Sequence, residues 1–247
     1  MKPKAGQPRN LLLQAMERTI GAKIDAERIL LEQGNVICEP WDGMRSAYFP
    51  LSSVLSAVST RGDGTTLATA LRGHEAAFGL LSAIRKAKAQ TRGAVQIGGP
   101  TLRVEARHLA HIFDTSNEVR YLLLSYWDAV MFEYEQGAVC NSTHPVAARL
   151  NGYLLEIHER VIGDVVPLTH EDIANLIGVN RTTVSLVMSR LRHTGIIETD
   201  RAHIRIVDRR RLFDAGCDCY SRVRKRFEAL YQEPSPASAL PDREGLT

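Results

Sequence analysis

The chain has 247 residues, of which 44% are hydrophobic and 24% charged, and its formal net charge is +3. These values are those of an ordinary globular protein, and they exclude collagenous, coiled-coil-only and wholly disordered chains. No apolar run approaches the roughly 20 residues that span a bilayer, and the basic N-terminus lacks the apolar stretch of a secretory signal. We therefore expect a cytoplasmic protein without a membrane segment.

The first periodic segment of the chain is helical. Leu12, Met16 and Ile20 recur at the four-residue spacing that places side chains on one face of a helix. This spacing predicts a helix within residues 1–30.

Residues 29–105 predict a small antiparallel barrel or roll. Short runs rich in β-branched residues alternate there with turn residues, as in compact all-β domains. Two hairpins are expected: one over 53–71, with an Asp-Gly turn at 61–64, and one over 94–105, with its turn at Gly98-Gly99.

The segment from His108 to Gly137 predicts one long helix, because it contains neither glycine nor proline before Gly137 and carries two adjacent apolar stripes. A helix of about 25 residues is about 37 Å long, and a second stripe on such a helix usually packs against a partner. We interpret it as a dimerisation helix, with an intramolecular strut as the alternative. The proposed interface residues are Leu122, Leu123, Tyr126, Trp127, Ala129 and Val130.

A hinge is expected over 140–145, where polar residues precede a proline, and a further helix over 146–161. The tail from Glu233 is rich in proline, serine and alanine and has few large apolar residues, so we expect it to be disordered.

The basic residues are concentrated toward the C-terminus. Residues 180–226 carry 12 arginines and lysines and 5 acidic side chains. Such an excess indicates a polyanionic partner, although a solvated helix face is the alternative.

Residues 168–195, LTHEDIANLIGVNRTTVSLVMSRLRHTG, have the spacing of a helix-turn-helix rather than that of an unrelated helical hairpin. Thr169 followed by Asp172 predicts a capping box at the start of the first helix. Asn180 is a good N-cap for the second helix, and Gly195 a good C-cap. The core and turn positions that fit the motif are Ile173, Ala174, Ile177, Gly178, Val179, Val184 and Val187.

The outward face of the second helix is expected to contact DNA, because the N-terminal half of such a helix reaches base edges in the major groove. Arg181 is the candidate for a bidentate contact to guanine, with a solvated surface arginine as the alternative. Thr169 and His170, at the start of the first helix, are placed to meet phosphate. The other candidate contacts of this face are Asn180, Thr182, Ser185, Leu186 and Ser189.

A strand pair directly after the second helix predicts a winged helix. Residues 196–199 and 203–207 alternate apolar and polar side chains around a polar turn at 200–202. Arg201 and His203 on this wing are expected to contact the DNA backbone, which adds affinity but little sequence preference.

The segment LTHEDIANLIGVNRTTVSLVMSRLRHTGIIE, after a β-rich region and a long helix, resembles the Crp/Fnr superfamily of bacterial transcription regulators. The likeness is strong over 145–212 and collinear over 25–144, where YFPLSSVLSAVSTRGDGTTLATALRGHEAAFGL resembles the double-stranded β-helix roll of the family. The resemblance implies an α+β fold, with a jelly-roll-like double-stranded β-helix followed by a winged helix-turn-helix. It also implies a non-enzymatic homodimer that binds a pseudo-palindromic operator and RNA polymerase.

The resemblance implies a division of the chain into domains, with a cyclic-nucleotide-binding-like sensor roll first and a DNA-binding domain last. Its parts are the roll over 1–107, a dimerisation helix and hinge over 108–144, the winged helix-turn-helix over 145–232 and the tail over 233–247.

The effector is not identified by the resemblance. Cyclic-nucleotide-binding members of the family use Gly-Glu-Leu followed by Arg-Ser-Ala, whereas here the weak candidates are a displaced Glu75 and an Arg92 without its serine. A cyclic nucleotide is therefore not expected. The N-terminal cysteine cluster of the iron–sulfur branch is absent from the sequence, and the lone His74 does not indicate haem, so no cofactor is expected. Because Thr182 and Leu186 replace family residues of the recognition helix, the family operator is not implied either.

The cysteines Cys38, Cys140, Cys217 and Cys219 are too scattered for a disulfide framework. If Cys217 and Cys219 lay on one helix, their sulfurs would be separated by about 200° of rotation. We therefore interpret both as structural thiols, with a metal or redox pair as the alternative, and expect no metal site.

Two rival functions remain. A metal-dependent β-roll enzyme of the cupin kind needs several histidines and a carboxylate on neighbouring strands, but His108 and His111 lie on a predicted helix with no third ligand evident in the sequence. The other rival is a ligand-independent partner of RNA polymerase.

Overall fold

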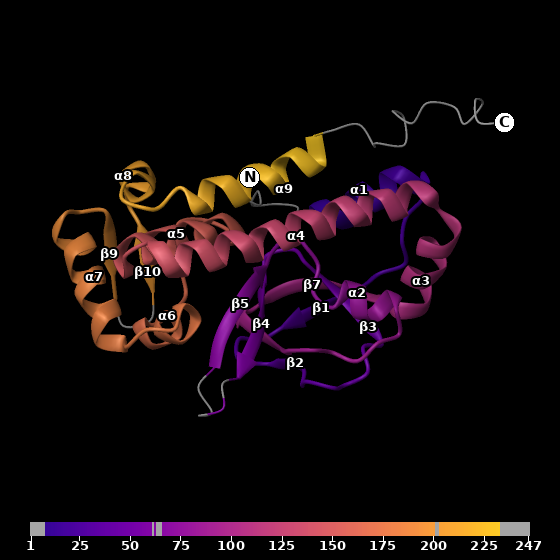
Figure 1. The fold of residues 1–247 in the computed structure, drawn as a ribbon, viewed down its shortest axis with the longest axis horizontal. Helices are drawn as coiled ribbons and strands as arrows, with labels where there is room; N and C mark the ends of the chain where they lie inside the picture. The colour runs from indigo at the N-terminus through magenta and orange to yellow at the C-terminus, as the bar shows by residue number, and fades with distance from the viewer. Residues whose placement is uncertain (1–7, 61, 63–65, 201–202, 233–247) are drawn as a thin grey trace.

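The computed structural model of the protein describes residues 8–60, 62, 66–200 and 203–232 (Figure 1). It places a β-rich N-terminal half beneath a long helix, α4 (Asn117–Thr143), and a mainly helical C-terminal part beyond the end of that helix. Three predicted features lie outside the described residues: the tail over 233–247, most of the turn at 61–64, and Arg201.

The N-terminal half is a roll built from two antiparallel sheets, as predicted. One sheet has the strand order β1-β7-β3 and the other the order β2-β6-β4-β5. Apolar side chains between the sheets, among them Leu55, Phe78 and Val95, form one of the hydrophobic clusters. The elements of this half are α1 (Leu11–Ile20), β1 (Glu27–Leu31), β2 (Val36–Cys38), β3 (Ser46–Pro50), β4 (Val54–Thr60), β5 (Thr66–Arg72), α2 (Leu80–Ile84), β6 (Arg92–Ile97) and β7 (Gly99–Glu105).

One of the two predicted hairpins is confirmed and the other is wrong. Strands β4 and β5 pair antiparallel, whereas β6 and β7 belong to different sheets. The chain crosses from one sheet to the other at the two glycines. A side chain would not fit at either position: a Cβ at Gly98 would lie 2.9 Å from the Leu31 carbonyl oxygen, and one at Gly99 would lie 2.9 Å from the Ser53 nitrogen. Gly98 and Gly99 thus permit close backbone approach, not a hairpin turn.

The segment predicted as one helix over 108–137 is two helices, α3 (Ala106–Thr115) and α4. Ser116 separates them, and its Oγ accepts a hydrogen bond of 3.2 Å from the Val119 nitrogen, which caps α4. Helix α4 continues through Gly137 to Thr143, so the hinge predicted over 140–145 narrows to His144 and Pro145.

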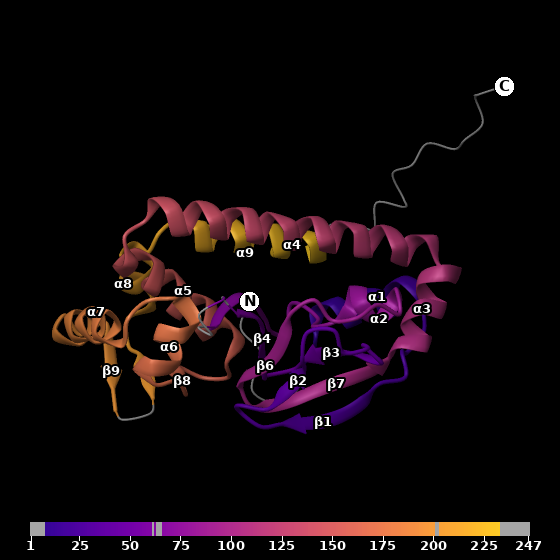
Figure 2. The ribbon, with the colours of Figure 1, turned by 60° about the horizontal axis from the view of Figure 1, so that its bottom comes forward.

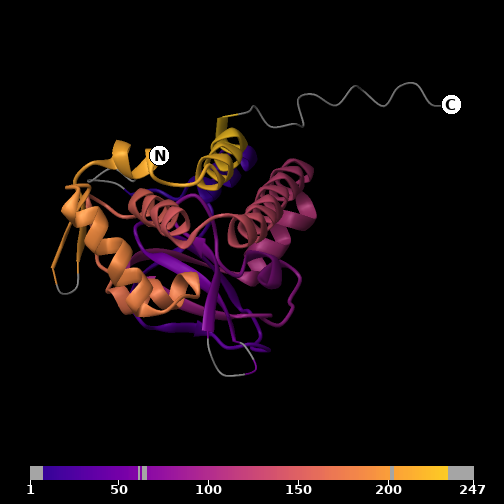
Figure 3. The same cartoon turned by 60° about the vertical axis from the view of Figure 1, so that its left-hand side comes forward.

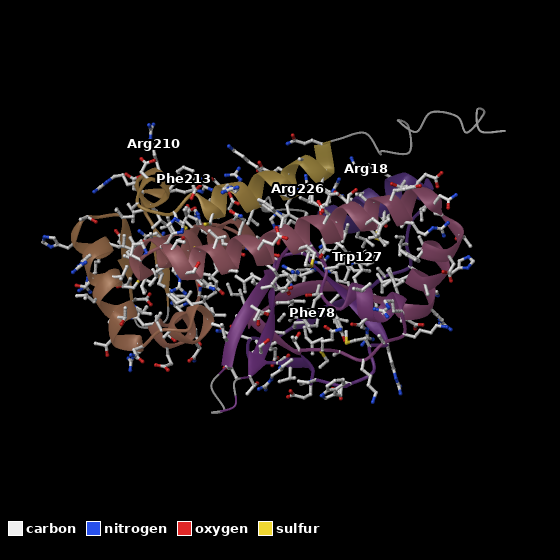
Figure 4. All side chains as sticks on the ribbon, in the orientation of Figure 1. Arg18, Phe78, Trp127, Arg210, Phe213 and Arg226 are labelled. Atoms are coloured by element: carbon white, nitrogen blue, oxygen red, sulfur yellow. The ribbon has the colours of Figure 1, made fainter. Side chains whose placement is uncertain are left out.

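Four residues expected at a dimer interface are buried inside the single chain, which corrects that assignment. Leu122, Leu123, Tyr126 and Ala129 are each at most 8% exposed and belong to a cluster that includes Phe227. Val130 and Trp127, which is labelled in Figure 4, are half-buried against the same cluster. The Trp127 ring lies 6.2 Å from that of Phe113.

These α4 residues are buried because the C-terminal helix α9 (Cys219–Gln232) runs back alongside α4 and reaches α1 (Figures 1 and 3). Tyr126 and Phe227 pack edge to face at 6.2 Å. The stretch 145–232, expected to be one domain, therefore contains a helix that packs with the N-terminal half. The large apolar side chains of α4 that remain exposed are Tyr121, Leu124, Met131, Tyr134 and Val139.

The C-terminal part combines helices with a small antiparallel sheet of order β8-β10-β9. None of the described helices is both long and apolar enough to cross a membrane. The elements are α5 (Val146–Arg160), β8 (Val165–Val166), α6 (His170–Ile177), α7 (Arg181–His193), β9 (Ile197–Thr199), β10 (Ile204–Ile206), α8 (Arg209–Asp214) and α9.

The roll and the C-terminal part lie side by side (Figure 2), and they share one cluster of apolar side chains. Val54, Leu71 and Ile97 of the roll join the cluster that contains the helix-turn-helix core. Moreover, a Cβ at Gly178, in the turn between α6 and α7, would lie 2.9 Å from Leu67 Cδ1 in β5. The position of the helix-turn-helix is therefore set partly by the roll.

Candidate DNA-binding site

The first helix of the motif, α6, begins with the predicted capping box. The Thr169 hydroxyl accepts a hydrogen bond of 3.1 Å from the Asp172 nitrogen, and the Asp172 carboxylate accepts one of 2.8 Å from the Thr169 nitrogen. Two of the N–H groups that lack an intrahelical acceptor at the start of α6 are thereby satisfied. At the other end, the Arg149 guanidinium donates a bond of 3.0 Å to the Ile177 carbonyl oxygen, so α5 holds the end of α6.

The turn that joins α6 to α7 has the expected glycine geometry. Gly178 has a φ of 68°, in the left-handed region that glycine adopts without strain. Ile173 and Val184 are fully buried and belong to the same hydrophobic cluster. Asn180 has the extended backbone of an N-cap, but its side chain makes no cap hydrogen bond to the described residues. The helix-turn-helix prediction is thus confirmed in its core and turn, though not in the Asn180 side-chain cap.

The outer face of α7 is exposed along its N-terminal half. This helix lies at the edge of the molecule farthest from α3 (Figure 1). The predicted contact residues Arg181, Thr182 and Leu186 are solvent-exposed there, and Ser189 is exposed further along the helix. The structure therefore gathers most of the predicted α7 contacts on one open surface, which we call the α7 outer face.

Two further predicted residues are bonded to each other. His170 Nδ1 lies 3.1 Å from Ser185 Oγ, which links the first turn of α6 to the middle of α7. Burial lowers the pKa of His170, and the nearby charges of Arg181 and Arg192 lower it further. A neutral His170 at neutral pH suits a hydrogen-bonded positioning of Ser185.

Arg181 has a carboxylate within reach at the start of α6. Its Nε lies 3.8 Å from Glu171 Oε2, and both side chains are more than half exposed. An ion pair this exposed is weak, about 0–1 kcal/mol, so the guanidinium can leave Glu171 for another acceptor.

The predicted wing is present as the β9–β10 pair. Asp200 Oδ1 accepts a 2.9 Å hydrogen bond from the His203 nitrogen and lies 3.2 Å from His203 Nδ1, which shapes one side of the turn. His203 is exposed at the tip of the described wing, whereas Arg201 lies outside the described residues.

Part of the C-terminal basic excess is used within the molecule. Glu159 in α5 lies 2.6 Å from Arg209 and 3.1 Å from Arg224, and Arg226 pairs with Asp128 of α4. In contrast, Arg210 projects from α8 into solvent (Figure 4). Charge counting alone therefore overstates the positive surface that is open to a polyanion.

The two weak effector candidates do not form a common site in the described structure. Glu75, between β5 and α2, lies 2.8 Å from Arg160 of α5, whereas Arg92, in β6, lies 3.4 Å from Glu39. Burial favours a higher pKa for Glu75, but the Arg160 charge outweighs it and lowers the pKa to about 2. Glu75 is therefore ionised at neutral pH and already paired with Arg160.

Buried charges also line the junction of roll and helices, a feature that the sequence analysis missed. Arg72 lies 2.6 Å from Glu133, and Arg160 lies 2.7 Å from Glu156. Burial and the neighbouring carboxylates raise the pKa of Glu156, although the Arg160 charge opposes them. A cavity of about 360 Å³ is lined in part by Glu133, Glu156 and Arg160. The i,i+4 spacing of Glu156 and Arg160 was the only signal for this network in the sequence.

The metal-capable side chains that the described structure brings together are not those of a roll enzyme. His108 and His111 lie on α3, outside the group formed by Cys140, His144, Cys217 and Cys219. The rotation argument for Cys217 and Cys219 is wrong, because α9 begins at Cys219 and Cys217 precedes it.

Comparisons with known proteins agree with this geometry. Residues 148–215 match the Crp-like helix-turn-helix domain family. The fold is similar to that of FixK2 from Bradyrhizobium japonicum, with a TM-score of 0.68 and 18% identity over 78% of this chain and 98% of that one. It is also similar to a CRP-family transcriptional regulator from Thermus thermophilus, with a TM-score of 0.62 and 19% identity over 76% and 95% of the chains.

A third similar structure is CLP from Xanthomonas campestris, described as a c-di-GMP responsive global regulator, with a TM-score of 0.51 and 16% identity over 73% and 93% of the chains. No curated protein matches the sequence. Residues 148–215 therefore form a Crp-like helix-turn-helix domain, and the fold of the chain is similar to that of solved Crp/Fnr-type regulators.

Proposed function

We propose that the protein is a homodimeric, sequence-specific DNA-binding regulator that reads its operator with the α7 outer face. The observation that carries the proposal is the exposure of Arg181, Thr182 and Leu186 on a helix whose opposite side is anchored by buried Val184 and Met188. A rigid helix that offers polar and basic side chains at its N-terminal half suits the major groove.

In this proposal the roll senses a signal or serves in dimerisation, and the helix-turn-helix with its wing contacts DNA. Helix α9 is assigned to the N-terminal half, since it packs along α4 and α1. A symmetric dimer would place two α7 helices about 34 Å apart, one turn of DNA, and would therefore prefer a pseudo-palindromic site.

The dimer surface is assigned to the exposed apolar residues of α4. Tyr121, Leu124 and Met131 recur at spacings of three and seven residues and lie on one side of the helix. They replace the buried residues that periodicity alone selected.

The proposal is tested by selecting bound duplexes from a random DNA pool, with wild-type protein and the Arg181→Ala variant in parallel. The variant is expected to lose about 1–3 kcal/mol of binding free energy and to relax its preference at one base pair per half-site. Arg18→Ala serves as the matched control, because Arg18 lies on α1 in the N-terminal half (Figure 4). Unchanged base preference in Arg181→Ala would contradict the role of Arg181, and no enrichment by wild-type protein would contradict the proposed function.

A further inference from the structure

Four side chains with metal-binding atoms converge where α4 ends and α9 begins. Cys140 lies in the last turn of α4, His144 is the residue that terminates this helix, and Cys217 and Cys219 flank the start of α9. One ligand atom from each of the four lies within 4.8 Å of all the others. Cys219 is buried and the other three are half-buried.

The fold brings these segments together for identifiable reasons. Cys140 and His144 are four residues apart, so they lie on the same side of the helix end. Helix α9 starts beside the end of α4 and runs back along it (Figures 1 and 2).

The loop before α9 is held in place by α5. The buried Asn151 side chain donates a hydrogen bond of 2.9 Å to the Ala215 carbonyl oxygen. Gly152 packs beside the same loop, since a Cβ there would lie in ordinary van der Waals contact with Cys217 Sγ, at 3.6 Å. Helix α5 thus helps to position the loop that carries Cys217.

The spacing of the ligand atoms fits a tetrahedral metal ion. Zn–S bonds of about 2.3 Å and Zn–N bonds of about 2.0–2.1 Å place two sulfurs about 3.8 Å apart and a sulfur about 3.5 Å from a nitrogen. The Cys140 and Cys217 sulfurs are 3.5 Å apart, and Cys219 Sγ is 3.6 Å from His144 Nδ1. A disulfide, in contrast, requires about 2.05 Å between sulfurs.

The donor set selects the ion. Three thiols and one imidazole are ligands for a borderline-soft divalent cation, and complete four-coordination by protein groups is typical of structural zinc. A bound cation supplies the positive charge that makes several adjacent thiolates stable.

We propose that Cys140, His144, Cys217 and Cys219 form a structural Zn²⁺ site that fastens the start of α9 to the end of α4. The site adjoins Pro145, where the chain passes from α4 into α5. Zinc at this position would therefore hold the joint between the long helix and the DNA-binding part. This inference is independent of which DNA sequence the protein reads.

The first test is elemental analysis of full-length wild-type protein purified under reducing conditions. We expect one zinc ion per chain. After replacement of zinc by Co²⁺, the absorption spectrum should show the ligand-field bands of tetrahedral cobalt together with thiolate-to-cobalt charge transfer. Cys217→Ser and His144→Ala should each lose most of the metal.

Matched controls remove the same chemical groups elsewhere. Cys38→Ser changes a cysteine inside the roll, and His111→Ala changes an exposed histidine of α3, so both should keep full metal content. If a cluster variant fails to fold, thiol alkylation of the native wild-type protein still decides the question, because chelation should make Cys140, Cys217 and Cys219 newly reactive.

Three results would overturn the inference. Wild-type protein that is isolated without metal and takes up neither Zn²⁺ nor Co²⁺ has no such site. A Cys140–Cys217 disulfide in native protein would assign these thiols to redox chemistry. Equal metal loss in Cys38→Ser or His111→Ala would place the metal elsewhere.

Discussion

Arg181 and Glu171 form an ion pair that the proposed function requires to be broken. The two side chains lie 3.8 Å apart at the entrance to the α7 outer face. Both are largely exposed, so solvent and salt screen the pair. On DNA, the guanidinium would exchange this carboxylate for base or phosphate acceptors, while the Glu171 charge would remain close to the phosphate backbone.

Glu171→Gln is therefore expected to strengthen DNA binding. Removing one exposed carboxylate should change the binding free energy by about 0.2–1 kcal/mol, which is at most about fivefold in Kd, and the gain should shrink as salt is added. Fluorescence anisotropy with the selected duplex at several salt concentrations measures it. Glu27→Gln, which disrupts the exposed pair between Glu27 and Arg103 in the roll, is the matched control. Weaker binding by Glu171→Gln would mean that Glu171 positions Arg181.

At the scale of elements, α4 has one apolar face that is buried within the chain and another that is exposed to solvent. Leu123 and Tyr126 are buried by α1 and α9, whereas Leu124 is 56% exposed and Met131 58% exposed. Helical periodicity identified α4 as apolar on two sides, but the identity of the inner side depended on α9. The free apolar side is the one assigned above to the dimer.

Leu124→Glu is expected to weaken the dimer without unfolding the chain. A leucine that becomes buried in an interface contributes about 1.5–3 kcal/mol, so the dimer Kd should rise by about ten- to hundredfold. Analytical ultracentrifugation measures the Kd, and far-UV circular dichroism checks the fold. Leu30→Glu in β1 changes an exposed leucine of the roll and should leave the dimer intact. If Leu124→Glu also left it intact, the interface would lie elsewhere.

At the scale of the whole molecule, the roll and the helix-turn-helix part are joined by the ion pair between Glu75 and Arg160. Gly73 permits this contact, because a Cβ there would lie 2.5 Å from Arg160 Cγ. Arg160 also pairs with Glu156, so one buried guanidinium contacts two half-buried carboxylates from the two parts of the chain. Removing it leaves charges buried without compensation.

Arg160→Met is expected to lower the free energy of unfolding by about 3–5 kcal/mol. In wild-type protein the pKa of Glu75 is about 2, below the ordinary glutamate value of about 4.3. The unfolded chain thus binds the proton first, and the stability supplied by this carboxylate is full above about pH 5 and lost as the pH falls toward 2.

Denaturant unfolding between pH 7 and pH 3 measures both effects. The acid-dependent loss should be smaller in Arg160→Met than in wild-type protein. Arg103→Met, which removes the exposed partner of Glu27, should cost no more than about 1 kcal/mol. If the two variants lost equal amounts of unfolding free energy, Arg160 would contribute no more to stability than the exposed Arg103.

Much of the helix-turn-helix was determined by local sequence. The Thr169–Asp172 capping box, the left-handed Gly178 and the buried positions of α6 and α7 depend on neighbours within about thirty residues, and helix periodicity, capping and turn chemistry report such neighbours directly. Most of the predicted strands of the roll were confirmed for the same reason.

Only the tertiary structure decided the remaining features. One such feature is the placement of β6 and β7 in different sheets. The others are contacts between residues far apart in the chain: the burial of Leu122 and Tyr126 by α9, the Glu75–Arg160 pair and the convergence of Cys140 with Cys217. Periodicity shows that a face is apolar or that a thiol is present, but it does not show which distant segment covers that face or meets that thiol. Those partners are set by how the packed elements share one core.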